Sequence, residues 1–256
     1  MKSKLIIALF VVISVIFVVP IHAAKNIHVY VALCDNEHQG IVPVPKSLGN
    51  GKDPANNLYW GAMYGVKSFF GRSENWERIK CYNPEESHIL ERCLFRHKKD
   101  STMMVADAYD GEFIKTAIED MIKASAGLKK DTLKIDSLTV PIHGNADLLA
   151  YLGHNGLMEF DVAIDSGDSD GKSRDVIVLA CASEYYFRPK LRAPGANPLL
   201  WTTGLMAPEA YTLEAAIESW LGNEGSSTVR EKAAEAYSRY QKCSIAGARR
   251  LFKSGF

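Results

Sequence analysis

The sequence predicts an α/β fold in which a mainly parallel sheet is flanked by helices. Two observations carry this prediction: strand-like apolar runs alternate with runs of helical periodicity, and several apolar runs are continuous, as in strands buried on both faces. Helices on both sides of such a sheet give three layers. Residues 25–256 have a length common for one α/β domain, so we expect a single domain there.

The chain begins with a segment typical of protein export. Two lysines precede the apolar run Leu5–Val19, and Pro20 is followed by the small residues Ala23 and Ala24. This layout predicts a cleavable signal peptide over residues 1–24 and a secreted or periplasmic protein. An uncleaved membrane anchor is the alternative, although the apolar run is shorter than the roughly 20 residues of a span.

The remaining elements follow from apolar periodicity and turn residues. We predict strands at Asn26–Leu33, Arg78–Tyr82, Ser101–Tyr109, Leu148–His154, Asp175–Cys181 and Pro198–Gly204. We predict helices at Asn57–Phe70, at Gly111–Gly127 with Gly127 as C-cap, at Pro208–Gly222 with Pro208 in the first turn, and over the rest of the C-terminal part. A long loop is expected over residues 34–56, and residues 133–144 stay ambiguous.

A histidine and a cysteine end two of the predicted strands. The run "LLAYLGH" ends on His154, and "DVIVLAC" ends on Cys181. Parallel strands end at the same edge of a sheet, where ligands gather. A thiolate attacks carbonyl carbons, and a nearby imidazole can activate the thiol or protonate a departing amine. Gly156 can present a backbone N–H to the oxyanion. The pattern predicts catalysis by a Cys-His pair.

These two blocks resemble the signature of the caspase-like cysteine peptidases, which include caspases, legumains, gingipains and bacterial CHAT domains. In that signature one hydrophobic strand ends in His-Gly and a second ends in Ala-Cys; here the blocks read "LLAYLGHNG" and "VIVLACAS". Ala180-Cys181 matches the second block, and Ser183 is similar to the Cys-x-Ser of CHAT domains. The resemblance implies a caspase-like three-layer fold, Cys181 as nucleophile, His154 as general acid and base, and an oxyanion hole near Gly156 and at Cys181.

Two departures place the chain nearer to the bacterial CHAT and gingipain-like members than to true caspases. Asn155 separates the histidine from the glycine, so the oxyanion donor is displaced or is Asn155 itself. The spacing from His154 to Cys181 is shorter than the roughly 50 residues of caspases, and the Gln-Ala-Cys-x-Gly motif is absent. His143, which a glycine follows directly, is the rival partner of Cys181. We favour His154, because Pro141 is unfavourable in a central strand.

The chain has five cysteines, an odd number for a protein that is expected to be exported. A cysteine left over after the others pair within the chain is either a free thiol or forms a disulfide with another chain. Cys34, Cys81, Cys93 and Cys243 lie in or beside predicted loops and helix ends, where disulfides fit; Cys181 ends a strand of buried type and is the expected free thiol. The alternative is that several cysteines are buried and reduced.

Other patterns narrow the function classes. With 30 basic and 30 acidic residues, nothing indicates a nucleic-acid partner. No Cys-x-x-Cys pair, phosphate-binding glycine motif or Gly-x-Ser-x-Gly elbow is present, so we expect no metal and no cofactor. The acidic stretch Asp165–Gly171 is expected to be a solvated connector rather than a Ca²⁺ site. The segment Tyr185–Pro198 is either a surface loop or a recognition loop whose Arg188, Lys190 and Arg192 bind an acidic side chain.

The function that these observations favour is an exported cysteine endopeptidase or amidase acting on proteins or peptides, with no membrane insertion once the signal is cleaved. A secreted binding module or pseudoenzyme of the same fold is the alternative. A cell-envelope structural protein whose cysteines are all paired is a third class. The sequence leaves the substrate preference and the oligomeric state open.

Overall fold

A computed structural model describes residues 24–163 and 169–256. Its centre is an eight-stranded sheet with the strand order β10-β9-β8-β7-β1-β4-β3-β2. Five neighbouring strands in the middle are parallel: β9 (Asn197–Thr202), β8 (Asp175–Leu179), β7 (Leu148–Leu152), β1 (Asn26–Ala32) and β4 (Met103–Tyr109). The predicted α/β fold with a mainly parallel sheet is confirmed, and all five of these strands were expected from the sequence.

Antiparallel strands extend the sheet on both sides. On one side, β3 (Ile89–His97) pairs with β4, and β2 (Trp76–Tyr82) pairs with β3. On the other side, the short β10 (Phe252–Lys253) pairs with β9. A separate hairpin of β5 (Lys130–Ile135) and β6 (Leu138–His143) accounts for the segment left ambiguous by the sequence.

Helices cover both faces of the sheet. One face packs against α1 (Val66–Phe70), α4 (Ala210–Leu221), α5 (Ser226–Gln241) and α6 (Ile245–Leu251). The other face packs against α2 (Ile114–Ser125) and α3 (Ser183–Arg192). Two short 3₁₀ turns, η1 (Gly111–Phe113) and η2 (Gly156–Met158), follow β4 and β7. Two apolar cores, one on each side of the sheet, therefore form a three-layer arrangement.

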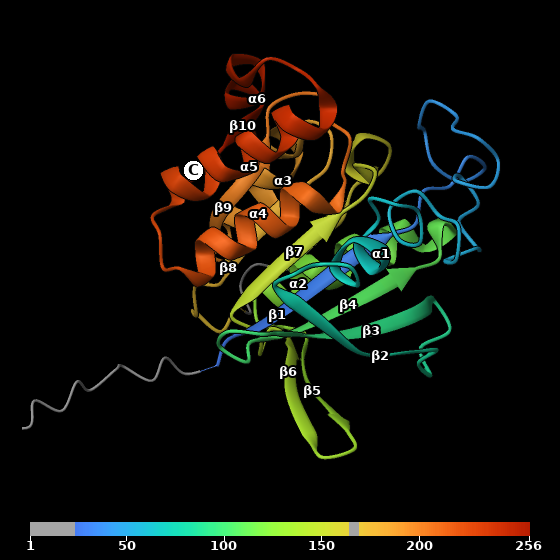
Figure 1. Cartoon of the computed structure of the whole chain (residues 1–256), viewed down its shortest axis with the longest axis vertical. Helices are drawn as coiled ribbons and strands as arrows, with labels where there is room; N and C mark the ends of the chain where they lie inside the picture. Colours follow the sequence, from blue (N-terminus) through green and yellow to red (C-terminus); the bar gives the residue numbers. More distant parts are fainter. Residues whose placement is uncertain (1–23, 164–168) are drawn as a thin grey trace, which may run out of the picture.

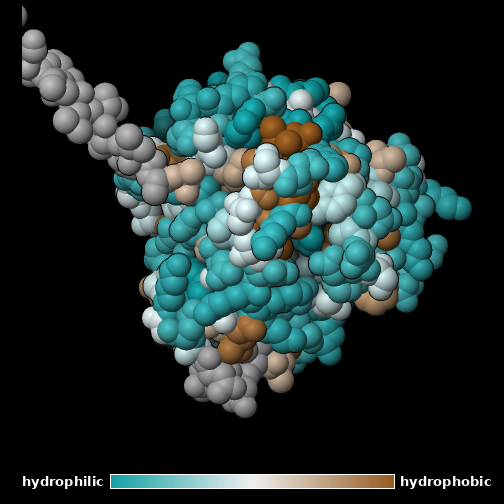
Figure 2. All heavy atoms as spheres, turned by 90° about the horizontal axis from the view of Figure 1, so that it is seen from below, coloured by the Kyte–Doolittle hydropathy of each residue, from teal (hydrophilic) through white to brown (hydrophobic). Residues whose placement is uncertain are grey.

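The five parallel strands share one edge at which they all end, which we call the carboxyl edge. In Figure 1 the arrowheads of β4 and β7 point towards this edge, and the long loop after β1, drawn in blue to cyan, lies there. The β5–β6 hairpin projects away from the sheet in the same view. Figure 2 looks from the side of the hairpin and shows a mostly hydrophilic surface with limited hydrophobic areas. In the part of the chain described, no helix is long and apolar enough to cross a membrane.

The predicted helix at Asn57–Phe70 is wrong over most of its length. Only α1 is helical there, and turns precede it. The side chain of Asn57 bonds the backbone of Cys34, accepting from its N–H at 3.0 Å and donating to its carbonyl at 2.8 Å. A side chain at Gly61 would clash with the carbonyl oxygens of Pro54 and Ala55. These close contacts hold the segment as a folded loop against the end of β1.

The segment Tyr185–Pro198 is also corrected, because most of it belongs to a helix rather than to a loop. α3 continues through Pro189, although proline removes a helical hydrogen bond. Phe187 and Leu191, four residues apart, are both fully buried against the sheet. This packing on one helical face outweighs the cost of the proline. A smaller correction concerns Pro208, which precedes α4 instead of lying in its first turn.

A buried charged group connects the three strands β1, β4 and β3. Asp107 accepts two hydrogen bonds from Arg92, at 2.6 and 2.8 Å, and lies 3.0 Å from Nε2 of His28. Burial alone would raise the pKa of Asp107, but the hydrogen bonds from Arg92 and His28 bring it well below its ordinary value. The carboxylate therefore stays charged and satisfied in the middle of the sheet.

Candidate active site

His154 and Cys181 lie beside each other along the carboxyl edge. β7 and β8 are neighbouring parallel strands, and Leu152 pairs with Leu179 at their ends. His154 and Cys181 each lie two residues beyond this last pair. They therefore follow the ends of adjacent strands at the same position along the strand direction, and such strands are about 4.8 Å apart. The side chain of Asn155 donates to the Cys181 carbonyl at 2.6 Å and ties the two segments together. The expected juxtaposition of the two strand ends is confirmed.

Cys181 occupies a tight turn between β8 and α3. The next residue, Ala182, has φ 48°, a left-handed conformation that is costly for a residue other than glycine. Its N–H donates to the Gly204 carbonyl at 2.8 Å, which holds the turn against the loop after β9. Backbone strain of this kind persists only where the surroundings enforce it, and it is common at functional sites. The turn places Cys181 immediately before the amino end of α3, where the helix carries partial positive charge.

The sulfur of Cys181 contacts a backbone group of the loop after β9. The N–H of Met206 donates to Sγ at 3.4 Å, and the thiol lies 3.5 Å from the Met206 carbonyl oxygen. The thiol therefore accepts from the Met206 N–H and donates to the Met206 carbonyl, which fixes the sulfur against the loop after β9. Cys181 is only partly buried.

His154 is held by a carboxylate that no sequence motif marks. Nε2 of the buried His154 lies 2.5 Å from Oε1 of Glu159. A carboxylate only accepts, so Nε2 carries the proton of this bond and Nδ1 is the nitrogen free to exchange a proton. The same Glu159 oxygen accepts from the N–H of Gly40 at 2.9 Å. Tyr151 donates from its hydroxyl to the His154 carbonyl at 2.7 Å, which fixes the backbone below the ring.

Gly156 lies close to His154 at the start of η2, and its N–H is already engaged. It donates to the His154 carbonyl at 3.2 Å. By contrast, the N–H groups of Asn155 and Cys181 donate to no acceptor among residues 24–163 and 169–256. These two amides belong to the two segments that the Asn155 side chain ties together, so both remain available to an oxyanion.

His143 lies away from the carboxyl edge. Its Nδ1 lies 2.8 Å from the hydroxyl of Tyr30, and its N–H donates to Nδ1 of His28 at 3.0 Å. Both partners are in the body of β1, two and four residues before its end. Burial lowers the pKa of His143 to about 2, with the charges of His28 and Lys129 acting in the same direction. A neutral, enclosed imidazole of this kind is a structural group.

The structure brings His154 and Cys181 to the same edge without joining their side chains. Among the described residues, the contacts of the Cys181 sulfur are with Met206, and those of the His154 ring are with Glu159. Catalytic hydrogen bonds often form only when substrate is bound. The arrangement provides a thiol, an imidazole oriented by a carboxylate, and two unengaged amides at one site.

The other cysteines divide into one disulfide and two free thiols. Cys81 and Cys93 form a disulfide between the directly opposed positions of β2 and β3. Cys34 is buried, and its burial raises the pKa of the thiol to about 11. Cys243 is an exposed free thiol near the end of α5. Cys181 is therefore one of three free thiols in the described chain.

Metal binding has little support in the residues that the structure describes. The cluster with metal-binding side chains there is Cys81, Glu91 and Cys93, in which the two sulfurs are bonded to each other. Most of the acidic stretch Asp165–Gly171 falls outside the described residues. Within it, Asp170 pairs with Arg174 and Lys130, each at 2.7 Å, and these hydrogen bonds lower the pKa of its carboxyl.

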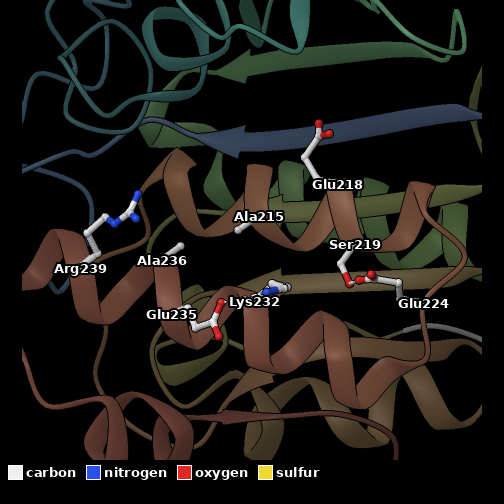
Figure 3. Close-up of a pocket in the computed structure, with 8 residues that line it drawn as sticks. All are labelled: Ala215, Glu218, Ser219, Glu224, Lys232, Glu235, Ala236 and Arg239. Atoms are coloured by element: carbon white, nitrogen blue, oxygen red, sulfur yellow. Dashed lines mark hydrogen bonds and ion pairs between the residues drawn. The ribbon is translucent and has the colours of Figure 1, made fainter.

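A surface groove of about 600 Å³ between α4 and α5 is shown in Figure 3. Several of its polar side chains are already paired: Ser219 donates to Glu224, and Lys232 lies 3.1 Å from Glu235. None of the predicted site residues lines it. The groove therefore offers no chemistry comparable to that of the carboxyl edge.

Comparison of the chain with models of protein families, with curated proteins and with solved structures found no match.

Proposed function

We propose that the protein is a cysteine endopeptidase or amidase that uses Cys181 as nucleophile and His154 as general acid and base on a caspase-like fold. The observation that carries the proposal is the matched register of β7 and β8, which delivers both residues to one edge. The Glu159 carboxylate on His154 supports it, because a base held by a third group is typical of an activated nucleophile. The proposal includes secretion or residence in the periplasm. Its basis is the predicted signal peptide, which lies almost wholly outside the described residues.

The reaction follows the usual two steps of acyl transfer. The thiolate of Cys181 forms a bond to the carbonyl carbon, and the carbonyl electron pair moves to oxygen. When the oxyanion collapses, the carbon–nitrogen bond breaks and the His154 imidazolium gives its proton to the departing amine. A water molecule then gives a proton to His154 while its oxygen bonds to the thioester carbon. When this second oxyanion collapses, the carbon–sulfur bond breaks, the carboxylic acid product leaves, and the Cys181 thiolate and His154 imidazolium are restored. The Asn155 and Cys181 amides stabilise the oxyanion in both steps.

The test is proteolysis of a denatured protein mixture, read as new amino termini by mass spectrometry. The wild type is expected to generate new termini, whereas Cys181→Ala and His154→Ala are expected to generate none. Cys243→Ala is the matched control for Cys181→Ala, because Cys243 is a free thiol that is exposed near the end of α5. Cleavage that survives in Cys181→Ala would contradict the proposal. Loss of cleavage in His143→Ala but not in His154→Ala would assign the base to the other histidine.

A secreted non-catalytic binding module or pseudoenzyme is the second candidate. It is favoured by one observation: the Cys181 sulfur contacts Met206 rather than the His154 ring. This candidate predicts a wild type that produces no new termini and a Cys181 that reacts no faster than Cys243 with an alkylating reagent.

A further inference from the structure

Among the described residues, ten large apolar side chains are exposed, and five of them lie on segments that follow parallel strands. One follows each of the five parallel strands: Val42 after β1, Phe113 after β4, Met158 after β7, Tyr185 after β8 and Leu205 after β9. Their exposed fractions run from 42% to 88%. Because parallel strands end together, all five leave the sheet at the carboxyl edge, where Cys181 lies.

Four of these residues lie within four positions of groups of the candidate site in the chain, and we call these four the apolar rim. Leu205 precedes Met206, whose backbone contacts the Cys181 sulfur. Met158 precedes Glu159, the partner of His154. Tyr185 lies one helical turn after Cys181. The fourth member, Val42, is two residues from Gly40, whose N–H meets Glu159.

The basic side chains that could have selected an acidic substrate are engaged elsewhere. Arg188 forms an ion pair with Glu184 within α3. Lys190 lies 2.6 Å from Asp161 and donates to the Val162 carbonyl at 2.8 Å. The guanidinium of Arg192 lies over the ring of Phe256, at 5.1 Å from its centre. The recognition of an acidic side chain by these three residues therefore loses its basis.

We propose that the apolar rim binds the substrate chain, so that the enzyme cleaves next to aliphatic and aromatic residues of unfolded or extended proteins. This inference rests on the proposed function. Exposed apolar residues beside a functional site mark binding surfaces, and each rim residue lies within four positions of a group of the candidate site. Its occupant is an extended peptide with Leu, Met or Phe side chains near the scissile bond. Each apolar side chain that the rim covers gains affinity from the area removed from water.

Two measurements separate this inference from the proposed function. The first is binding of a fluorescent nonapeptide rich in Leu and Met to the Cys181→Ala protein, compared with a nonapeptide in which serine replaces each Leu and Met. Tighter binding of the apolar peptide is expected, with an affinity about tenfold lower in a Leu205→Asp background, since burying one leucine is worth about 1.5 kcal/mol or more. Leu128→Asp is the matched control, because Leu128 is exposed beyond the end of α2.

The second measurement is the residue distribution around cleavage sites made by the wild type in denatured proteins. Enrichment of Leu, Met, Phe and Tyr supports the inference, and enrichment of charged residues overturns it while leaving the peptidase intact. Equal binding of both nonapeptides, or equal loss in Leu205→Asp and Leu128→Asp, also overturns it. Apolar binding without any cleavage would support the rim and refute the peptidase.

Discussion

Replacing Glu159 by glutamine removes the charge of its carboxylate and keeps its size. The His154 imidazolium that forms during catalysis then loses a charged partner 2.5 Å from Nε2. A hydrogen bond to a charged group contributes about 1.5–3 kcal/mol. The Glu159 side chain is 36% exposed, so solvent screening places the effect near the lower end of this range. We expect kcat/KM to fall about tenfold in Glu159→Gln, mostly through kcat.

The assay is hydrolysis of a fluorogenic peptide derived from a mapped cleavage site, with kcat and KM measured separately. Asp161→Asn is the matched control, because Asp161 is an exposed acid two residues away that pairs with Lys190. Gly40→Ala should reproduce the loss of activity, because a Cβ there would lie 2.9 Å from Cδ of Glu159 and displace its carboxylate. Equal activity of Glu159→Gln and wild type would refute the orienting role of Glu159, and a loss confined to KM would assign it to substrate binding.

Three further outcomes are expected. Burial lowers the pKa values of both His28 and His143, so the unfolded state binds more protons than the native state below pH 6.5, and stability is retained above that pH and lost as the pH falls. The loss from His143 alone should reach about 1.4 kcal/mol at pH 5.5, measured by urea unfolding, and His143→Gln should remove that part of the pH dependence. Amino-terminal sequencing of protein recovered from the medium or envelope should start near Ala24 or Lys25, and an intact leader there would support the anchor. Alkylation of Cys34 in the folded protein at pH 8 should be slow, because burial raises the pKa of its thiol to about 11; rapid modification would show that the end of β1 opens.

The parallel strands were predictable because their apolar runs are continuous and bounded by turn residues. β3 was missed because charged residues interrupt its sequence, "ILERCLFRH". Arg92 in this strand is buried because Asp107 on β4 neutralises it. The partner that makes an arginine tolerable in a strand lies 15 residues away in the chain, and periodicity gives no sign of it.

The residues of the site that lie at strand ends were predictable from the sequence, and the others were not. His154 and Cys181 could be named because each ends an apolar run, and register then brings them together. Glu159 could not be named in this way, because a single acid five residues after a histidine is no motif. Its role depends on the turn η2, which folds the chain back towards the ring. Likewise, the contact of Met206 with the Cys181 sulfur depends on the loop after β9.

The most direct test of the account is the alkylation rate of Cys181 relative to Cys243, in the wild type and in His154→Ala. A typical thiol is less than about one per cent thiolate at pH 6, so an exposed cysteine reacts slowly with iodoacetamide there. If His154 activates Cys181, mass spectrometry of timed digests should show Cys181 modified at least about tenfold faster than Cys243, with the advantage lost in His154→Ala but kept in His143→Gln. A Cys181 that reacts no faster than Cys243, or equally fast without His154, would contradict the Cys-His pair.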